Sequence, residues 1–162
     1  MVENTLSADE TATLADALRA LRSELLAGPD EAPPREGSKG PGRGMCSMRP
    51  GEPDAPQHFL SHLIEADPAI TAYATHPRLV GMCEEYIGGE ARIVESNSFM
   101  NTGNDPSTMS TGEFVPGWHR GADLPYATHS EGGLVHCNFV KALSNLTELA
   151  HKDDGGTVVS IR

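Results

Sequence analysis

The chain has 162 residues, a length that can close a single hydrophobic core. Its net charge of −11 argues against sequence-independent binding to nucleic acid or to an anionic membrane surface, because both need clustered cations. No apolar run reaches the length of a membrane span, and the acidic start is not a secretory signal. Three scattered cysteines form neither a disulfide framework nor a zinc knuckle, which favours a reducing, cytoplasmic compartment.

The first predicted element is an amphipathic helix over residues 8–27. The stretch "SADE" at 7–10 has the pattern of a capping box, in which Ser7 and Glu10 satisfy free amides at a helix start. Four leucines follow at helical spacing, namely Leu14, Leu18, Leu21 and Leu25. We expect this stripe to face the core, with a partner-binding surface as the alternative.

A flexible linker is predicted over residues 28–56, which combine many breakers with almost no apolar side chains. Residues 57–90 are expected to be helical, beginning with a short helix in "QHFLSHLIEADP". A second helix begins at Pro68, since proline suits a first helical position. A third ends at the glycine pair Gly88-Gly89.

Two histidines of this helical part, His58 and His62, are four residues apart. That spacing can bind zinc on one helix face, although no third ligand or catalytic glutamate accompanies the pair. We therefore interpret them as packing or solvated histidines.

Strands are predicted from residue 91 onward. "ARIVESNSFMNT" and "GLVHCNFVKALSNL" are rich in strand-forming residues, and "DDGG" predicts a turn into a third strand, "TVVSI". Helices thus precede strands, which favours an α+β fold in which helices buttress one face of an antiparallel sheet.

Several segments, in this order, resemble the phytanoyl-CoA dioxygenase-like family of iron(II)/2-oxoglutarate oxygenases. The leading helix and the helix before Gly88-Gly89 are similar to the family's opening segments. "GWHRG" at 117–121 takes the place of its metal-binding W-H-x-D element. "HCNFVKALSNLTEL" and "DDGGTVVSIR" are similar to later strands, the second of which normally runs into Gly-Ser-His.

This resemblance implies a double-stranded β-helix, or jelly roll, with N-terminal helices packed on its outside; residues 91–162 would form its first part. It implies iron(II) held by two histidines and a carboxylate, with 2-oxoglutarate as cosubstrate. The implied activity is hydroxylation of a small or lipid-like organic substrate. His119, preceded by Trp118, matches the first histidine of the metal site.

The position of the acid ligand departs from the family pattern, because Gly121 stands where the carboxylate is expected. Asp123 lies two residues further on, and a bulge at Gly121 could return it to the metal. Two alternatives remain open: a halogenase-type relative in which a halide occupies the vacated position, and a non-catalytic jelly-roll remnant that binds a ligand or partner.

Later elements of the family pattern are matched only in part. Phe139 lies where many relatives place an aromatic ring beside 2-oxoglutarate, and a core aromatic is the alternative. Lys141 could reach an anionic cosubstrate from the same strand face, although a surface lysine is the simpler interpretation. His129, His136 and His151 do not match the distal histidine by motif, so we expect an incomplete site and a fold that is unfinished at its C-terminal end.

Overall fold

The computed structural model describes residues 5–28, 46–49, 51–55, 57–101 and 128–148. The first element is the helix α1 (Ala8–Ala27), with the bounds that the sequence predicts. Its capping box is present, because the Ser7 side chain accepts from the Glu10 amide while the Glu10 carboxylate accepts from the Ser7 amide. At the other end, Gly28 has a φ of 92°, which side chains rarely adopt, and the helix stops there.

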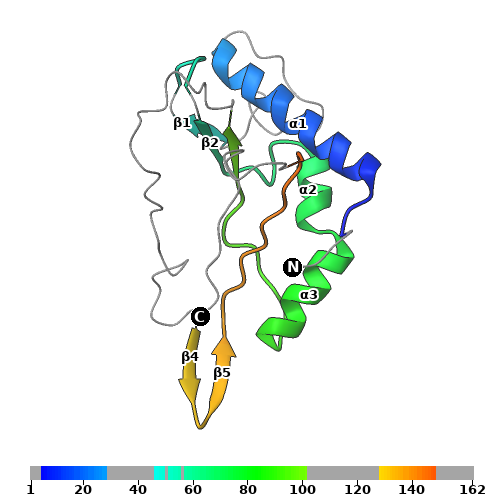
Figure 1. Ribbon diagram of the computed structural model, residues 1–162, viewed down its shortest axis with the longest axis vertical. Coiled ribbons are helices and arrows are strands. Elements are labelled where there is room, and N and C mark those ends of the chain that lie inside the picture. Colours follow the sequence, from blue (N-terminus) through cyan, green and yellow to red (C-terminus); the bar gives the residue numbers. More distant parts are fainter. Residues whose placement is uncertain (1–4, 29–45, 50, 56, 102–127, 149–162) are drawn as a thin grey trace.

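Three short strands form one antiparallel sheet in the order β1–β2–β3. They are β1 (Ser47–Arg49), β2 (Gln57–Ser61) and β3 (Asn97–Asn101). In the central register, Phe59 of β2 lies opposite Arg49 of β1 and opposite Phe99 of β3. Figure 1 shows α1 lying along one side of these strands.

The hydrophobic core lies between α1, the inner face of the sheet and the chain that follows β2. Its buried members are Leu14, Leu18, Leu21, Leu60, Leu63, Ala66 and Ile70. The leucine stripe of α1 is therefore a core-facing surface, with Leu25 half-buried at its edge. Met48 and Met100 pack against this cluster from the two outer strands, which fixes the face that each strand turns toward the helix.

The predicted helix over residues 57–67 is wrong, since residues 57–61 form the central strand. His58 and Leu60 are fully buried while Gln57 is exposed, and this alternation is the period of two that a half-buried strand requires. The chain then bends at His62, which has a φ of 58°. Ser96 Oγ accepts from the amides of Leu63 and Ile64, both at 3.0 Å, and so ties this bend to the start of β3.

The predicted linker over residues 28–56 also needs correction, because it contains β1. Ser47, Met48 and Arg49 pair with Ser61, Leu60 and Phe59 in register. Such a short strand at a sheet edge has little apolar content, so composition alone favours a linker. Residues 29–45 lie outside the described residues.

Two further helices agree with the sequence prediction. In α2 (Pro68–Ala74), the Asp67 side chain accepts from the Ala69 amide at 2.8 Å and Pro68 opens the helix. In α3 (Pro77–Ile87), the helix ends at Gly88 with a left-handed φ of 73°. None of the α3 side chains is fully buried.

A hairpin of β4 (Thr128–Glu131) and β5 (Leu134–Cys137) lies at the end of the molecule away from α1 (Figure 1). Gly132 and Gly133 both have positive φ, as a tight two-residue hairpin turn requires. The strand predicted over residues 133–146 thus ends at Cys137, and the predicted strand "TVVSI" lies outside the described residues. Helices beside antiparallel strands confirm the α+β class at this level.

Candidate functional site

A buried polar cluster joins α1 to the sheet. His58 is fully buried, and Arg22 Nε donates to its Nδ1 at 3.2 Å. Because Nδ1 accepts this bond, Nε2 carries the ring proton and donates to the Glu52 carbonyl at 2.9 Å. Arg22 also donates through Nη2 to the carbonyl of Pro53 at 3.0 Å. Both ring nitrogens are satisfied, so His58 is a structural histidine.

The possible zinc pair His58 and His62 does not form a common site. The strand turns His58 into the core, whereas His62 follows the strand and is exposed at the bend. Within the described ranges, no group of three or more His, Cys, Asp or Glu side chains could hold a metal ion. The burial of His58 and the exposure of His62 agree with their interpretation as packing or solvated histidines.

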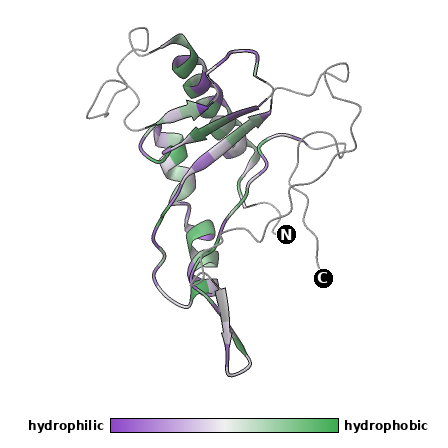
Figure 2. Cartoon of the chain, turned by 90° about the vertical axis from the view of Figure 1, so that its left-hand side faces the viewer, coloured by the Kyte–Doolittle hydropathy of each residue, from purple (hydrophilic) through white to green (hydrophobic). Residues whose placement is uncertain are grey.

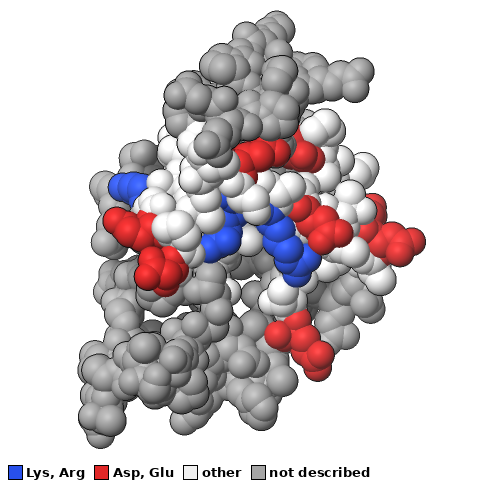
Figure 3. Space-filling model, turned by 90° about the horizontal axis from the view of Figure 1, so that it is seen from above, with Lys and Arg blue, Asp and Glu red and all other residues white. Residues whose placement is uncertain are grey.

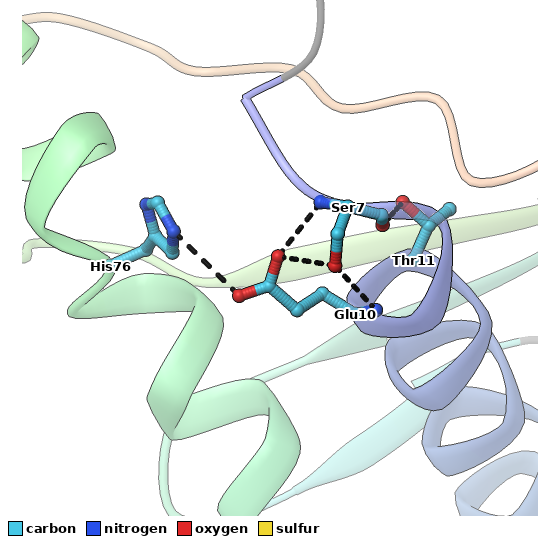
Figure 4. A network of polar contacts seen from close by, with 4 residues as sticks. All are labelled: Ser7, Glu10, Thr11 and His76. Atoms are coloured by element: carbon cyan, nitrogen blue, oxygen red, sulfur yellow. Dashed lines mark hydrogen bonds and ion pairs between the residues drawn. The ribbon is translucent and has the colours of Figure 1, made fainter.

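A second polar network lies where the start of α1 meets the start of α3 (Figure 4). Glu10 Oε2 accepts from both the amide and the hydroxyl of Ser7 at 2.7 Å, and Thr11 Oγ1 donates to the Ser7 carbonyl at 2.9 Å. These bonds from Ser7, with a smaller effect of His76, lower the pKa of Glu10 below its usual value of 4.5.

His76 reaches the same carboxylate from α3, with Nε2 3.8 Å from Glu10 Oε1. Its other ring nitrogen, Nδ1, is buried with no hydrogen-bond partner. The Ser7 hydroxyl already donates to a carboxylate and accepts a backbone amide, so it is not set up as a nucleophile. The network therefore caps α1 and connects two helices.

The predicted metal ligands His119 and Asp123 lie outside the described residues, as do Trp118 and Gly121. Phe139 follows β5 and is half-buried; its carbonyl accepts a hydrogen bond from the Cys137 thiol at 3.2 Å. Lys141 and His136 are exposed. The proposed contact of Phe139 with 2-oxoglutarate remains a prediction.

The sheet has an outward face, turned away from α1, that sequence reasoning missed. We define this outward face by the strand residues that alternate with the inward ones: Ser47, Arg49, Gln57, Phe59, Ser61, Asn97, Phe99 and Asn101. Figure 2 looks at the sheet from this side, with the helices behind the strands. The signal was the alternation in "QHFLS", which the helix prediction overrode.

The centre of the outward face is a row of one cation and two aromatic rings. The rings of Phe59 and Phe99 lie 5.0 Å apart at an angle of 45°, and the Arg49 guanidinium lies 5.5 Å from the centre of the Phe59 ring. Phe99 remains 61% exposed. Beside the row, Gln57 Nε2 donates to Asn101 Oδ1 at 2.8 Å. An exposed aromatic row with a cation at one end is suited to ligand binding.

Charged side chains of both signs lie on another side of the molecule (Figure 3). Figure 3, which views the molecule from above, shows basic side chains lying between acidic ones. On α1, Arg19 and Asp16 form an exposed ion pair of 2.8 Å. Such pairs contribute little to stability.

Comparison with known proteins gave no match, whether with protein-family models, with curated proteins or with solved structures. Across the described part of the chain, no helix is long and apolar enough to cross a membrane.

Proposed function

We propose that this chain is a domain of the iron(II)/2-oxoglutarate-dependent oxygenases of the phytanoyl-CoA dioxygenase-like type, with a double-stranded β-helix fold. The observation that carries the proposal is the order of the family-like segments along the chain, from the leading helix through "GWHRG" to "GGTVVSIR". Two of these segments, α1 and the α3 helix that ends at Gly88, have the expected helical structure.

The arrangement of helices and strands is compatible with that proposal. In the proposed fold, helices cover the outside of a sheet whose other face lines the ligand cavity. Here α1 packs on one face of β1–β2–β3, and the outward face carries aromatic, amide and guanidinium groups. Such groups suit a surface that lines a ligand cavity better than they suit an apolar core.

The proposed metal donors are His119 and Asp123, with Phe139 beside the cosubstrate. An imidazole and a carboxylate belong to the donor set that iron(II) oxygenases use, and the bound iron would supply the oxidative chemistry. The role of this chain's own residues is to hold the metal, orient the substrate and exclude water. The substrate in this proposal is a small or lipid-like organic molecule.

The proposal is tested by measuring manganese(II) binding, as a redox-stable substitute for iron(II), with electron paramagnetic resonance. The native chain is compared with His119→Ala and Asp123→Ala, and with His62→Asn as a control at an exposed histidine outside the proposed site. We expect binding to be lost in His119→Ala, weakened in Asp123→Ala and unchanged in His62→Asn. Equal affinity in all four proteins would refute the proposed metal site.

A second candidate is a non-catalytic jelly-roll module that binds a ligand without redox chemistry. Gly121 favours it, because a glycine supplies no carboxylate at the position where the family has one. The same glycine is compatible with a halogenase-type relative, in which a halide takes the vacant position. The halogenase-type alternative predicts that the iron(II) affinity of the native chain depends on chloride. It also predicts that Gly121→Asp abolishes this chloride dependence.

A further inference from the structure

Of the eight residues that define the outward face of the sheet, Arg49 is charged and the other seven are neutral. Its guanidinium contacts the Phe59 ring and pairs with no carboxylate of the described residues. The chain has 23 acidic residues and a net charge of −11, so this face, whose one charge is positive, differs in sign from the chain as a whole. The positive charge of Arg49 can attract an anionic ligand to the outward face.

The guanidinium carbon lies over the Phe59 ring, 5.5 Å from its centre, and the side chain is exposed. A guanidinium is planar, and its edge can match a carboxylate through two parallel hydrogen bonds. A single planar group of this kind suits one carboxylate. Binding of a nucleic-acid backbone would need several cations, and the outward face has only this one.

The apolar part of the ligand would lie on Phe99. This ring is 61% exposed at the other end of the row, although it already contacts Phe59 at 5.0 Å. Strands lie ~4.8 Å apart, so Arg49 and Phe99 are roughly 10 Å apart across β2, a span that a bicyclic aromatic acid can cover. Offset or edge-to-face contacts with the tilted rings would favour a planar aromatic group over a saturated one.

We propose that the outward face of the β1–β2–β3 sheet is a binding site for a planar aromatic carboxylate. Arg49 binds the carboxylate, while Phe59 and Phe99 contact the aromatic ring. Gln57 and Asn101, hydrogen-bonded to each other beside the row, form its polar border. This inference rests on the described sheet alone and does not depend on the proposed iron chemistry.

The experiment uses 2-naphthoate as the probe, titrated into the whole isotope-labelled chain and followed by the backbone amide signals. Naphthalene-2-carboxamide lacks the charge and cyclohexanecarboxylate lacks the aromatic ring, so these two compounds separate the two contributions. We expect 2-naphthoate to shift the signals of β1, β2 and β3, and both comparison compounds to bind more weakly.

Variants assign the contacts. Arg49→Gln is expected to weaken 2-naphthoate binding by about tenfold or more, since a hydrogen bond to a charged group is lost. Arg49→Lys keeps the charge without the planar edge and should give an intermediate loss, and Phe99→Thr should weaken 2-naphthoate more than cyclohexanecarboxylate. Arg92→Gln is the matched control at another exposed arginine.

Each of these side chains is exposed, so the variants should retain the amide spectrum of the folded chain. The proposal is overturned if 2-naphthoate leaves the sheet signals unshifted. It is also overturned if Arg49→Gln binds 2-naphthoate as tightly as the native chain and the Arg92→Gln control do.

Discussion

The two longer helices, α1 and α3, differ in how far their apolar sides are buried. On α1, four side chains are buried, including the fully buried Leu21, and the helix is packed against the sheet. On α3, the apolar side carries Leu79, Met82 and Cys83, which are only half-buried, and Tyr86, which is 71% exposed. The hydrophobic side chains of Ile93, Val94, Leu134 and Leu143 are exposed as well.

This difference shows that an amphipathic pattern predicts a helix and its apolar side, but it does not predict what covers that side. Stability should therefore be concentrated where α1 meets the sheet, since buried apolar area is the main favourable contribution to folding. The α3 helix should contribute to stability through its termini and its half-buried residues.

Core truncation should separate the two helices most clearly. Leu21→Ala should lower the free energy of unfolding by about 3 kcal/mol, because it removes a fully buried side chain and leaves a cavity. Tyr86→Ala on α3 should change it by no more than about 0.5 kcal/mol, as expected for an exposed position. Urea unfolding measures both; similar losses would contradict the contrast.

Removal of the buried hydrogen bond to His58 should have the next largest effect. Arg22→Met leaves His58 Nδ1 without its donor in the core, which should cost about 1–3 kcal/mol. Arg19→Met breaks only an exposed ion pair three residues earlier on the same helix, and should cost less than about 0.5 kcal/mol. Thermal unfolding of the two variants compares them directly. An equal loss of melting temperature would show that the hydrogen bond to His58 stabilises the protein no more than the exposed ion pair does.

Helix caps should show a smaller difference. Asp67→Ala removes the side-chain cap of α2 and should destabilise the protein by about 1 kcal/mol. His76, at the corresponding position of α3, makes no side-chain cap bond, so His76→Asn should stabilise the protein by about 0.5 kcal/mol. Chemical unfolding gives both signs, and a loss of stability in His76→Asn would mean that its contact with Glu10 outweighs the new cap.

The pH dependence of the α1 cap should be the smallest effect. Because the pKa of Glu10 is lowered in the fold, its stabilising contribution is complete above its ordinary value of 4.5 and is lost as the pH falls through the lower folded value. Glu10→Gln should therefore have a flatter stability profile below pH ~4.5 than the native chain. The exposed control Glu65→Gln should keep the native slope in the same unfolding series.

The helices were the part of the fold that local sequence signals could predict. Ser7, Asp67 and Gly88 mark helix ends through contacts within a few residues, so the helix ends can be predicted from the local sequence. The sheet was harder, since β1 and β2 have only three and five residues and their pairing is a long-range choice. In "QHFLSHLIEADP", an apolar content compatible with a short helix hid the alternation of a strand.

The candidate sites also differ in whether they depend on long-range contacts or on a local sequence motif. A histidine's role depends on what surrounds it, and nothing local in the sequence shows that Arg22, 36 residues away, bonds to His58. The aromatic row on the outward face likewise requires the register that brings Arg49, Phe59 and Phe99 together. His119 and Asp123 were identified by resemblance to a family motif, and their roles stay predictions.

The central functional claim is that this chain binds iron(II) together with 2-oxoglutarate. The most direct test is an anaerobic titration of the native chain with iron(II) and 2-oxoglutarate, followed by visible absorption. We expect a weak band that needs both additions and disappears in His119→Ala. A featureless spectrum in the native chain, at concentrations where His119-dependent manganese(II) binding is saturated, would contradict the oxygenase assignment and favour the non-catalytic module.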